Sequence, residues 1–542
     1  MTATEANLPA APATEEASRL SLLRARLAAP MPDDKPWGWL GPLLVTAFGG
    51  FLRFNRLEIP RAIVFDETYY VKDAWSILHH GVEWQPVTNA NSLIIAGHTN
   101  IFQACSGTGC GEYVVQPEVG KYMIAIGEWL FGLNSFGWRF ASAVFGTVAI
   151  LLVCRIARRM TRSTLLGCIA GVLMSLDGLE FVLSRTGILD IFLMTFVLAA
   201  FGCVVIDRDK SRARLAEAVA AAGGGLRGSR PRLGFRKWQL LAGIFLGLAV
   251  GTKWNAVWYI LGFGALTIAW DIGARRAAGL RYYYRGAFRD AVWLPLTFIV
   301  VPLAVYLASW TNWLVTNTGY DRDYAQQHGF NVPILAPLYS LYEYHYQAIV
   351  FGIGLRTPHP YQSQPWDWLL ITRPVAFYYQ SYFAPVAGPS HFCPPKGCTG
   401  AQWSQEVLAI GTPAIWWGSI AALLFCLGWW LLHRDWRAGA VLMGVIAGWG
   451  PWFPLVTRTK FYYYALEFEP FLILSLVLCL GLILGPATAT VSRRAVGAGI
   501  VGAYMLCVLL MFWYFYPILA AKLIPYSDWL SHMWYRVGKG WI

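Results

Sequence analysis

The sequence predicts an all-α polytopic membrane protein, and three features support this fold class. Hydrophobic residues make up 56% of the 542-residue chain and charged residues only 13%, whereas soluble domains carry roughly 25% charged residues. Apolar runs of about twenty residues recur along the chain, and each is long enough to cross a bilayer as a helix. The 27 Trp and 27 Tyr are typical of the aromatic belts at a membrane surface.

We expect about eleven transmembrane helices, one for each apolar run. The runs lie near residues 38–54, 138–154, 164–182, 187–206, 238–252, 254–272, 291–311, 413–432, 438–457, 467–487 and 496–516. Two long hydrophilic loops separate some of them, at residues 55–136 and 312–412. The chain then divides into a tail (1–36), an N-terminal transmembrane module (37–311), the second loop, C-terminal helices (413–516) and a C-terminal tail (517–542).

The distribution of basic residues predicts the orientation. The connection from Arg155 to Arg162 has four Arg and no acid, and that from Asp207 to Lys237 has nine Lys or Arg against three acids. Basic loops stay on the cytoplasmic side, so the N-terminus is expected inside and both long loops and the C-terminal tail outside a plasma membrane. Residues 1–36 lack an apolar signal segment and are expected to form a disordered cytoplasmic tail. The +13 net charge is explained by these loops, and no motif for nucleic-acid binding accompanies it.

Cysteines divide between the spans and the two outer loops. Cys105 and Cys110 lie in the first loop, and Cys393 and Cys398 lie in the second. Two short pairs on the outer side predict two local disulfides in an oxidising compartment, although four cysteines permit three connectivities. A four-thiolate zinc site is the alternative, but the spacing within each pair is wider than usual for zinc. The remaining six cysteines lie in or beside spans as apolar fillers.

Adjacent carboxylates, Asp66 and Glu67, follow the first apolar run, with Tyr69 and Tyr70 close behind. A carboxylate at the membrane surface can act as a general base for an attacking hydroxyl, while aromatic rings offer apolar faces to a sugar or lipid. The alternative is that Asp66 only caps the helix that starts here.

Further ionisable residues gather at the same outer side. Any single cation there is explained by snorkelling at the interface, but several against the positive-inside trend indicate a shared anionic ligand, such as a lipid phosphate. The expected ligands of the donor phosphate and sugar are Lys121, Arg139, Arg185, Asp190, Lys253, Arg458 and Lys460.

These residues suggest a mechanism. A sugar on a polyprenyl phosphate already has a good leaving group, so the enzyme needs cations for the phosphate and one carboxylate base. Neighbouring residues on a helix point about 100° apart, so we assign Asp66 as the base and Glu67 as an orienting or acceptor-binding neighbour. No residues are predicted as metal ligands, and a role for a divalent cation, Mg²⁺ or Mn²⁺, stays open.

Several motifs in order resemble the protein O-mannosyltransferases, and the resemblance runs from about residue 38 to the C-terminus. They are the Asp66-Glu67 pair, Gln116 to Lys121 (QPEVGK), Ser184 to Asp190 (SRTGILD), Gly251 to Asn255 (GTKWN), His359 to Ser363 (HPYQS) with Pro365-Trp366, and Arg458 to Pro470 (RTKFYYYALEFEP). The later motifs are similar to the bacterial, actinobacterial-type branch. Two departures stand out: Gln116 replaces a frequent His, and the second loop is too short for the extra domain of eukaryotic members.

The resemblance implies a GT-C glycosyltransferase that moves mannose from polyprenyl-phosphate-mannose to Ser or Thr of secreted proteins, with inversion. It implies Asp66 as the base, Glu67 in seating the acceptor and Arg139 at the lipid phosphate. Partners would be the lipid donor, Ser/Thr-rich proteins and the secretion translocon, and nucleic acid is not expected. The candidates for acceptor binding or sugar stacking are Tyr69, Tyr70, His359, Tyr361 and Tyr462. A structural role is the alternative for His359, as for His345 and His328.

Other functions stay open at this point. A related enzyme could use the same donor to glycosylate a cell-envelope glycolipid or polysaccharide, which hydropathy cannot distinguish, although motif order favours protein. A lipid flippase or transporter would also gather charge at membrane depth, but the sequence has no internal repeat or paired helix interruptions. An oligosaccharyltransferase-like enzyme is disfavoured because the chain lacks a Trp-Trp-Asp-Tyr-Gly sequence.

Overall fold

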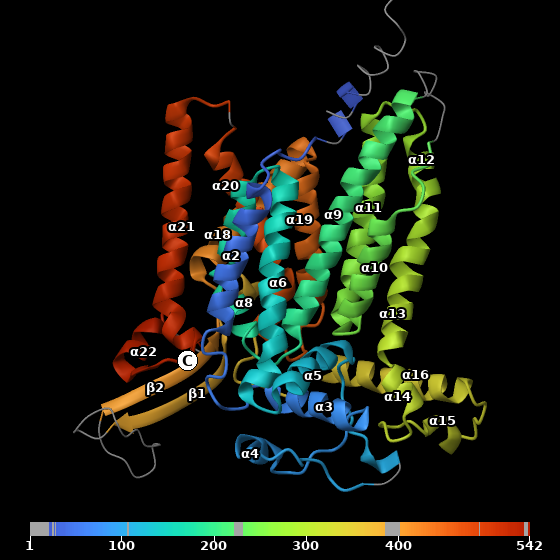
Figure 1. Ribbon diagram of the computed structural model, residues 1–542, viewed down its shortest axis with the longest axis vertical. Helices are drawn as coiled ribbons and strands as arrows, with labels where there is room; N and C mark the ends of the chain where they lie inside the picture. Colours follow the sequence, from blue (N-terminus) through green and yellow to red (C-terminus); the bar gives the residue numbers. More distant parts are fainter. Residues whose placement is uncertain are drawn as a thin grey trace, which may run out of the picture.

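The computed structural model describes residues 21–23, 26–27, 29–105, 108–221, 231–384, 401–486, 488–535 and 540–541. Long helices run side by side along the longest axis, and short elements gather at one end (Figure 1). All the predicted spans coincide with helices of this bundle. Most of the predicted tail 1–36 lies outside the described residues.

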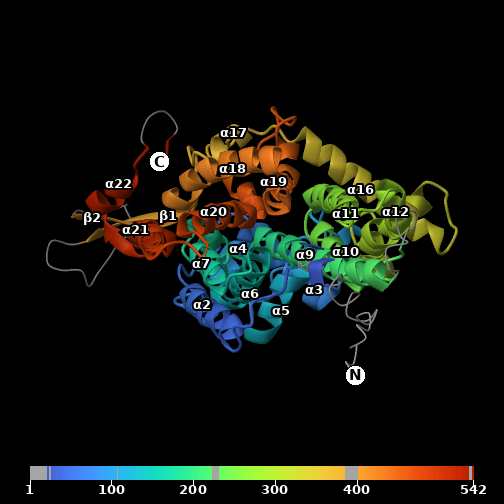
Figure 2. The same ribbon diagram turned by 90° about the horizontal axis from the view of Figure 1, so that it is seen from above.

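The bundle contains most of the long helices and several shorter ones. They are α2 (Trp37–Phe54), α6 (Ser135–Thr161), α7 (Thr164–Ser175), α8 (Gly178–Leu183), α9 (Asp190–Ala221), α10 (Lys237–Val250), α11 (Val257–Ala277), α12 (Tyr283–Asp290), α13 (Val301–Ser309), α18 (Pro413–His433), α19 (Trp436–Trp449), α20 (Glu469–Leu484) and α21 (Val491–Leu519). Within the described ranges, seven helical segments are long and apolar enough to cross a membrane. The other predicted spans are the shorter or less apolar helices α2, α7, α10 and α19. Seen from above, α9 lies inside the bundle (Figure 2), and most of α9 and α20 is buried.

Two predicted boundaries differ from the structure. The span at 164–182 is broken at Asp177, whose side chain accepts hydrogen bonds from Leu179 and Glu180 and starts α8. Helix α9 continues past residue 206, where the predicted span ended, to Ala221. The segment after residue 206 is polar but rich in residues that favour a helix, so it does not form a loop. Asp207 in this extension pairs with Arg236.

The first long loop folds against the end of the bundle. It contains α3 (Glu67–His80), α4 (Ala90–Ile95), the short turn Thr108–Cys110 and α5 (Val119–Phe131), which lie below the long helices in Figure 1. Cys105 and Cys110 form a disulfide, with their Cα atoms 5.5 Å apart. The loop therefore places its carboxylates close to the ends of helices that come from several parts of the chain.

Cys105 and Cys110 are expected to resist alkylation until a reductant is added, because a disulfide has no thiolate to react. The measurement is mass spectrometry after alkylation of denatured, non-reduced protein. The free cysteines in the bundle, such as Cys154 and Cys426, serve as internal controls and should be modified under the same conditions. Modification of Cys105 before reduction would contradict the pairing.

The second long loop holds the only β-sheet among the described residues. After α14 (Thr311–Val315), α15 (Tyr324–Gln327), α16 (Leu335–Gly354) and α17 (Pro365–Trp368), β1 (Val375–Ala384) pairs antiparallel with β2 (Ala401–Ala409). The C-terminal segment adds β3 (Leu523–Pro525) beside β2 and then forms α22 (Tyr526–His532). The all-α prediction omitted this small sheet, whose strands carry the aromatic residues that favour β structure. Cys393 and Cys398, with their predicted disulfide, lie outside the described residues.

Candidate active site

Arg139 on α6 is held entirely by protein acceptors. Its Nε donates to Glu67 Oε1 at 2.8 Å, and its Nη2 donates to Glu67 Oε2 at 3.0 Å. The other N–H groups donate to the backbone carbonyls of Leu57, Pro60 and Ala62 at 3.3, 2.9 and 2.9 Å. A guanidinium has five N–H donors, and all five are used here. In this structure every donor of Arg139 is thus committed to Glu67 and to the loop backbone, so its predicted contact with a lipid phosphate stays a prediction.

Glu67 is the other half of this buried pair. Its carboxylate also accepts from the backbone N–H of Val64 and of Gly187, each at 2.9 Å. The side chain is fully buried and links the start of α3 to α6 and to the segment before α9. Glu67 therefore orients the backbone that carries Asp66, which is one of the two roles expected for it.

Asp66 immediately precedes α3 but does not cap it. Its side chain makes no hydrogen bond to the first turn of the helix, which excludes the capping alternative in this structure. Instead, one carboxylate oxygen accepts a hydrogen bond of 2.9 Å from the hydroxyl of Tyr463. Desolvation raises the pKa of Asp66 to about 6, although nearby Lys253 and the Tyr463 hydrogen bond act in the opposite direction. A carboxylate with this pKa suits a general base near neutral pH.

Phe65 sets the direction in which Asp66 points. Its φ is +45°, in the left-handed region that bulky residues rarely adopt. The ring stacks on Phe377 of β1 at 4.8 Å and meets Phe461, Tyr463 and His359 edge-on. Backbone strain of this kind costs of order 1–3 kcal/mol and persists only where packing enforces it. The aromatic cluster is therefore a support for the Asp66 backbone.

Lys253 and Asp190 form a second charged pair close to Asp66. Their side chains are 2.7 Å apart and mostly buried, and both act on the pKa of Asp66. The Lys253 ammonium also lies 5.3 Å from the ring centre of Tyr464 and 6.0 Å from that of Tyr463. Three polypeptide segments thus converge here, from the start of α3, the start of α9 and the turn after α10.

A cavity of about 200 Å³ opens beside this pair. Asp190, Lys253, Asn255 and Arg458 provide its polar lining, together with Gln116. Its aromatic lining comes from Trp254, Phe351, Trp452 and Tyr464. A cavity with aromatic walls and a few convergent polar groups is the usual form of a small-molecule binding site.

Buried Glu467 fixes two residues that line this cavity. Its carboxylate accepts from Trp452 Nε1 at 3.0 Å and from the amide of Asn255. The amide oxygen of Asn255 is buried without a hydrogen-bond partner among the described residues. The cavity therefore has a rigid wall with an unused acceptor.

Arg458 is a cation of this cavity with donors to spare. Its Nε donates to the carbonyl of Gly352 at 2.6 Å and its Nη1 to that of Thr459 at 3.3 Å, while Nη2 has no hydrogen bond within the described ranges. Its guanidinium lies 5.4 Å from the ring centre of Trp452. Lys460, by contrast, is buried and donates to the carbonyl of Leu455, so it lies outside the cavity lining.

Two other predicted phosphate ligands are committed to the protein. Lys121 on α5 lies between Glu83 and Glu118, and its side chain is fully buried. Arg185 donates to four carbonyls at the end of α2, where cations complement the helix dipole. In this structure these two cations satisfy buried protein groups and do not line the cavity, so their predicted contact with the donor stays a prediction.

The predicted acceptor-binding or sugar-stacking residues lie in different surroundings. Tyr69 is exposed and Tyr70 is buried, so the two rings face different surroundings. His359 and Tyr361 lie near each other, with ring centres 5.8 Å apart, and His359 touches Phe65. Tyr462 is buried, and its hydroxyl accepts from the backbone N–H of Gly411 at 3.1 Å, away from Asp66.

No group of three or more His, Cys, Asp or Glu side chains that could hold a metal ion is present in the described part of the chain. The carboxylates near the cavity are engaged with Lys253, Tyr463, Trp452 and Asn255.

Comparisons with known proteins identify the family. The description "Dolichyl-phosphate-mannose-protein mannosyltransferase" matches residues 43–313, and "C-terminal four TMM region of protein-O-mannosyltransferase" matches residues 337–537. The chain belongs to the protein mannosyltransferase family. It is therefore a glycosyltransferase, and the site described above lies mainly on segments within these two matched regions.

Individual members of the family are similar along most of the chain. The polyprenol-phosphate-mannose–protein mannosyltransferase of Mycolicibacterium smegmatis is 38% identical over 517 residues, which cover 93% of both chains. The protein of the same name from Mycobacterium tuberculosis is 38% identical over 517 residues, covering 93% of this chain and 92% of that one. The prediction of an actinobacterial-type protein mannosyltransferase is confirmed.

The fold is also similar to a solved structure. The Saccharomyces cerevisiae protein O-mannosyltransferase Pmt1-Pmt2 complex bound to the sugar donor matches with a TM-score of 0.67 and 14% identity, covering 97% of this chain and 94% of that chain. The predicted GT-C fold of this protein mannosyltransferase is thereby confirmed.

Tyr463, Tyr464, Asn255 and Glu467 are among the residues of this mannosyltransferase site that sequence reasoning missed. These four residues lie in the quoted motifs, GTKWN and RTKFYYYALEFEP. The residues predicted from these motifs were Lys253, Arg458, Lys460 and Tyr462, although Tyr463 contacts Asp66 and Tyr462 does not. Consecutive Tyr residues point in different directions, and the sequence gives no sign of which one faces the carboxylate.

Proposed function

We propose that the protein transfers mannose from polyprenyl-phosphate-mannose to Ser or Thr hydroxyls of secreted proteins, with inversion at the anomeric carbon. The observation that carries this proposal is the Asp66 carboxylate, which is free of any helix-capping role and lies close to the Lys253–Asp190 pair. The names of the bacterial relatives support the choice of donor and of protein acceptor.

Asp66 acts as the general base in this scheme. The acceptor oxygen forms a bond to the anomeric carbon while the bond from that carbon to the phosphate oxygen breaks. The hydroxyl proton passes to Asp66 and then to water, and the phosphate leaves as an anion. No general acid is needed, because a phosphate is already a good leaving group, and a single displacement inverts the anomeric carbon.

Arg458 and Lys253, two of the donor ligands expected from the sequence, bind the donor. Both line the cavity, and Nη2 of Arg458 has an uncommitted N–H pair that can reach a phosphate oxygen. Charge-assisted hydrogen bonds to phosphate are among the stronger ones, and they strengthen as charge develops on the leaving group. Asp190 and Asn255 then face the sugar hydroxyls.

The active site faces the outside of the plasma membrane in this proposal, and the N-terminus lies in the cytoplasm. The basic connections at the opposite end of the bundle support this orientation. Acceptors would then be Ser/Thr-rich segments emerging from the secretion translocon. A divalent cation that takes part would have to bind largely through the donor phosphate, and adding Mg²⁺ or Mn²⁺ after EDTA treatment tests that role.

The proposed function is tested by incubating membranes that contain the protein with labelled polyprenyl-phosphate-mannose and a Ser/Thr-rich peptide. Mannose on the peptide is expected, and its anomeric configuration should be opposite to that of the donor. Label in a lipid or polysaccharide fraction, with none on the peptide, would instead favour a cell-envelope acceptor. Retention of the anomeric configuration would contradict the single-displacement mechanism.

The transfer rate is expected to fall as the pH drops below about 6, because Asp66 must be deprotonated to accept a proton and its pKa is raised to about 6. Tyr463→Phe removes a hydrogen bond that lowers this pKa, so the acidic limb should move to higher pH. The measurement is kcat/KM against pH for both proteins.

Tyr462→Phe is the matched control for the pH experiment, since its hydroxyl contacts Gly411 and not Asp66. Its acidic limb should coincide with that of the unchanged protein. An acidic limb that is the same in all three proteins would mean that another group titrates.

A further inference from the structure

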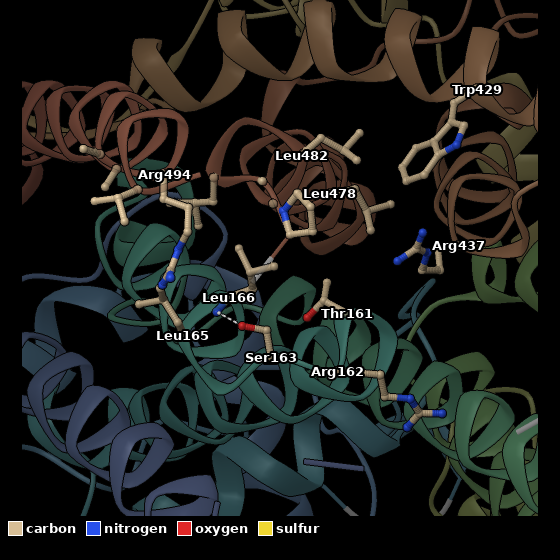
Figure 3. A pocket seen from close by; sticks show the side chains of 17 residues that line it. Thr161, Arg162, Ser163, Leu165, Leu166, Trp429, Arg437, Leu478, Leu482 and Arg494 are labelled. Atoms are coloured by element: carbon tan, nitrogen blue, oxygen red, sulfur yellow. Dashed lines mark hydrogen bonds between the residues drawn. The ribbon is translucent and has the colours of Figure 1, made fainter. Parts of the chain in front are cut away.

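A second, larger cavity of about 1190 Å³ lies at the end of the bundle opposite Asp66. Helices α7, α18, α19, α20 and α21 contribute its walls, and side chains around it are drawn in Figure 3. The walls are mainly apolar, and several of these apolar side chains are exposed, notably Leu165, Leu482 and Val491. Exposed apolar walls in a membrane protein are suited to a hydrocarbon chain.

Two arginines flank this cavity from opposite sides. Arg494 of α21 and Arg437 of α19 lie on its two sides in Figure 3. The Arg494 side chain is exposed and has no hydrogen bond or ion pair among the described residues. Arg437 pairs with Asp435 at 2.8 Å and lies 5.0 Å from the ring centre of Trp429. Arg162 also lines the cavity, but its guanidinium pairs with Asp209 at 2.8 Å.

The cavity lining contains three arginines and no carboxylate. An occupant must therefore combine a negative charge at the rim with an apolar body along the walls. A soluble anion would leave the apolar walls uncovered, and an uncharged lipid would leave Arg494 unpaired. Cations near a membrane surface attract anionic headgroups by about 1 kcal/mol each, and acyl chains gain by covering apolar surface.

We propose that this cavity, the arginine-rimmed cavity, binds an anionic phospholipid from the membrane leaflet at that end. The lipid phosphate lies between Arg494 and Arg437, and an acyl chain covers Leu165 and Leu482. The site is separate from the transferase site, because the two cavities share no lining residue. Its ligand remains bound and undergoes no reaction.

The test uses the full-length protein in nanodiscs of phosphatidylcholine that contain a small amount of phosphatidylglycerol with a photoreactive acyl chain. After irradiation, mass spectrometry should find the lipid on peptides that cover residues 478–498. A photoreactive phosphatidylcholine probe should label these peptides at least about fivefold less. Equal labelling by both probes would overturn the proposal, since it would show that the charge of the headgroup does not matter.

Variants assign the labelling to the arginines. Arg494→Gln should lower it about fivefold, and Arg437→Gln with Arg494→Gln about 25-fold. Arg281→Gln with Arg285→Gln is the matched control, because these exposed arginines precede and begin α12 and do not line the cavity. Labelling unchanged by Arg494→Gln would overturn the proposed phosphate position.

A further variant tests the apolar walls without changing charge. Ala498 lines the cavity and is exposed, so Ala498→Trp should fill the space and reduce labelling without disturbing the core. A free-phosphate site would respond differently, because inorganic phosphate would compete with the probe and Ala498→Trp would have no effect. Mannosyl transfer by each variant shows that the protein is still folded.

Discussion

Asp66→Asn is expected to lower the mannosyl transfer rate by roughly 10² to 10⁴, or about 3 to 5 kcal/mol in activation free energy, because an amide cannot accept the proton from the acceptor. The fold should survive, since the described contacts give the Asp66 side chain one hydrogen bond, from Tyr463, which the amide oxygen can still accept. The measurement is kcat for purified protein with saturating donor and peptide.

Glu58→Gln is the matched control for this variant, because Glu58 is a carboxylate of the same loop that does not line the donor cavity. It should transfer mannose at the normal rate. A normally folded Asp66→Asn protein with unchanged kcat would remove Asp66 from the role of base.

The second large effect concerns folding. Arg139→Ala should destabilise the protein by about 3 to 5 kcal/mol, because it leaves the buried Glu67 carboxylate without its cation. Arg139→Lys should recover little of this, since an ammonium cannot replace five N–H donors in a fixed plane. The measurement is the midpoint of thermal unfolding in detergent, together with the amount of protein in the membrane.

Arg61→Gln provides the control for Arg139, because Arg61 is an exposed arginine of the same loop. It should unfold at the normal temperature. Normal stability of Arg139→Ala, combined with a raised donor KM, would instead return Arg139 to the phosphate site.

Much of the architecture was predictable because hydropathy depends on sequence alone. Each apolar run is mainly helical, although the run at 164–182 is broken at Asp177, and the first long loop carries the carboxylates to one end of the bundle. The small sheet was not predicted, because β1 and β2 lie in a loop that was read only as hydrophilic and β3 comes from the distant C-terminal tail.

The site itself was predicted only in part. Asp190, Lys253 and Arg458 were named from sequence, and the structure places all three on one cavity. Arg139, Arg185 and Lys121 carry the same charge at the same membrane side, yet they serve Glu67, α2 carbonyls and two glutamates. The sequence shows that a cation is present, but it does not show which acceptors its N–H groups contact. Most of those acceptors come from distant parts of the chain and are known only from the three-dimensional structure.

The most direct test of the proposed donor site is a structure of this protein with a non-transferable analogue of polyprenyl-phosphate-mannose. We expect the donor phosphate within about 2.7 to 3.2 Å of Arg458 Nη2 or Lys253 Nζ, and the mannose in the cavity lined by Asp190 and Asn255. The space between the anomeric carbon and Asp66 should admit one hydroxyl. A phosphate bound to Arg139, or a sugar bound away from this cavity, would contradict the proposed donor site.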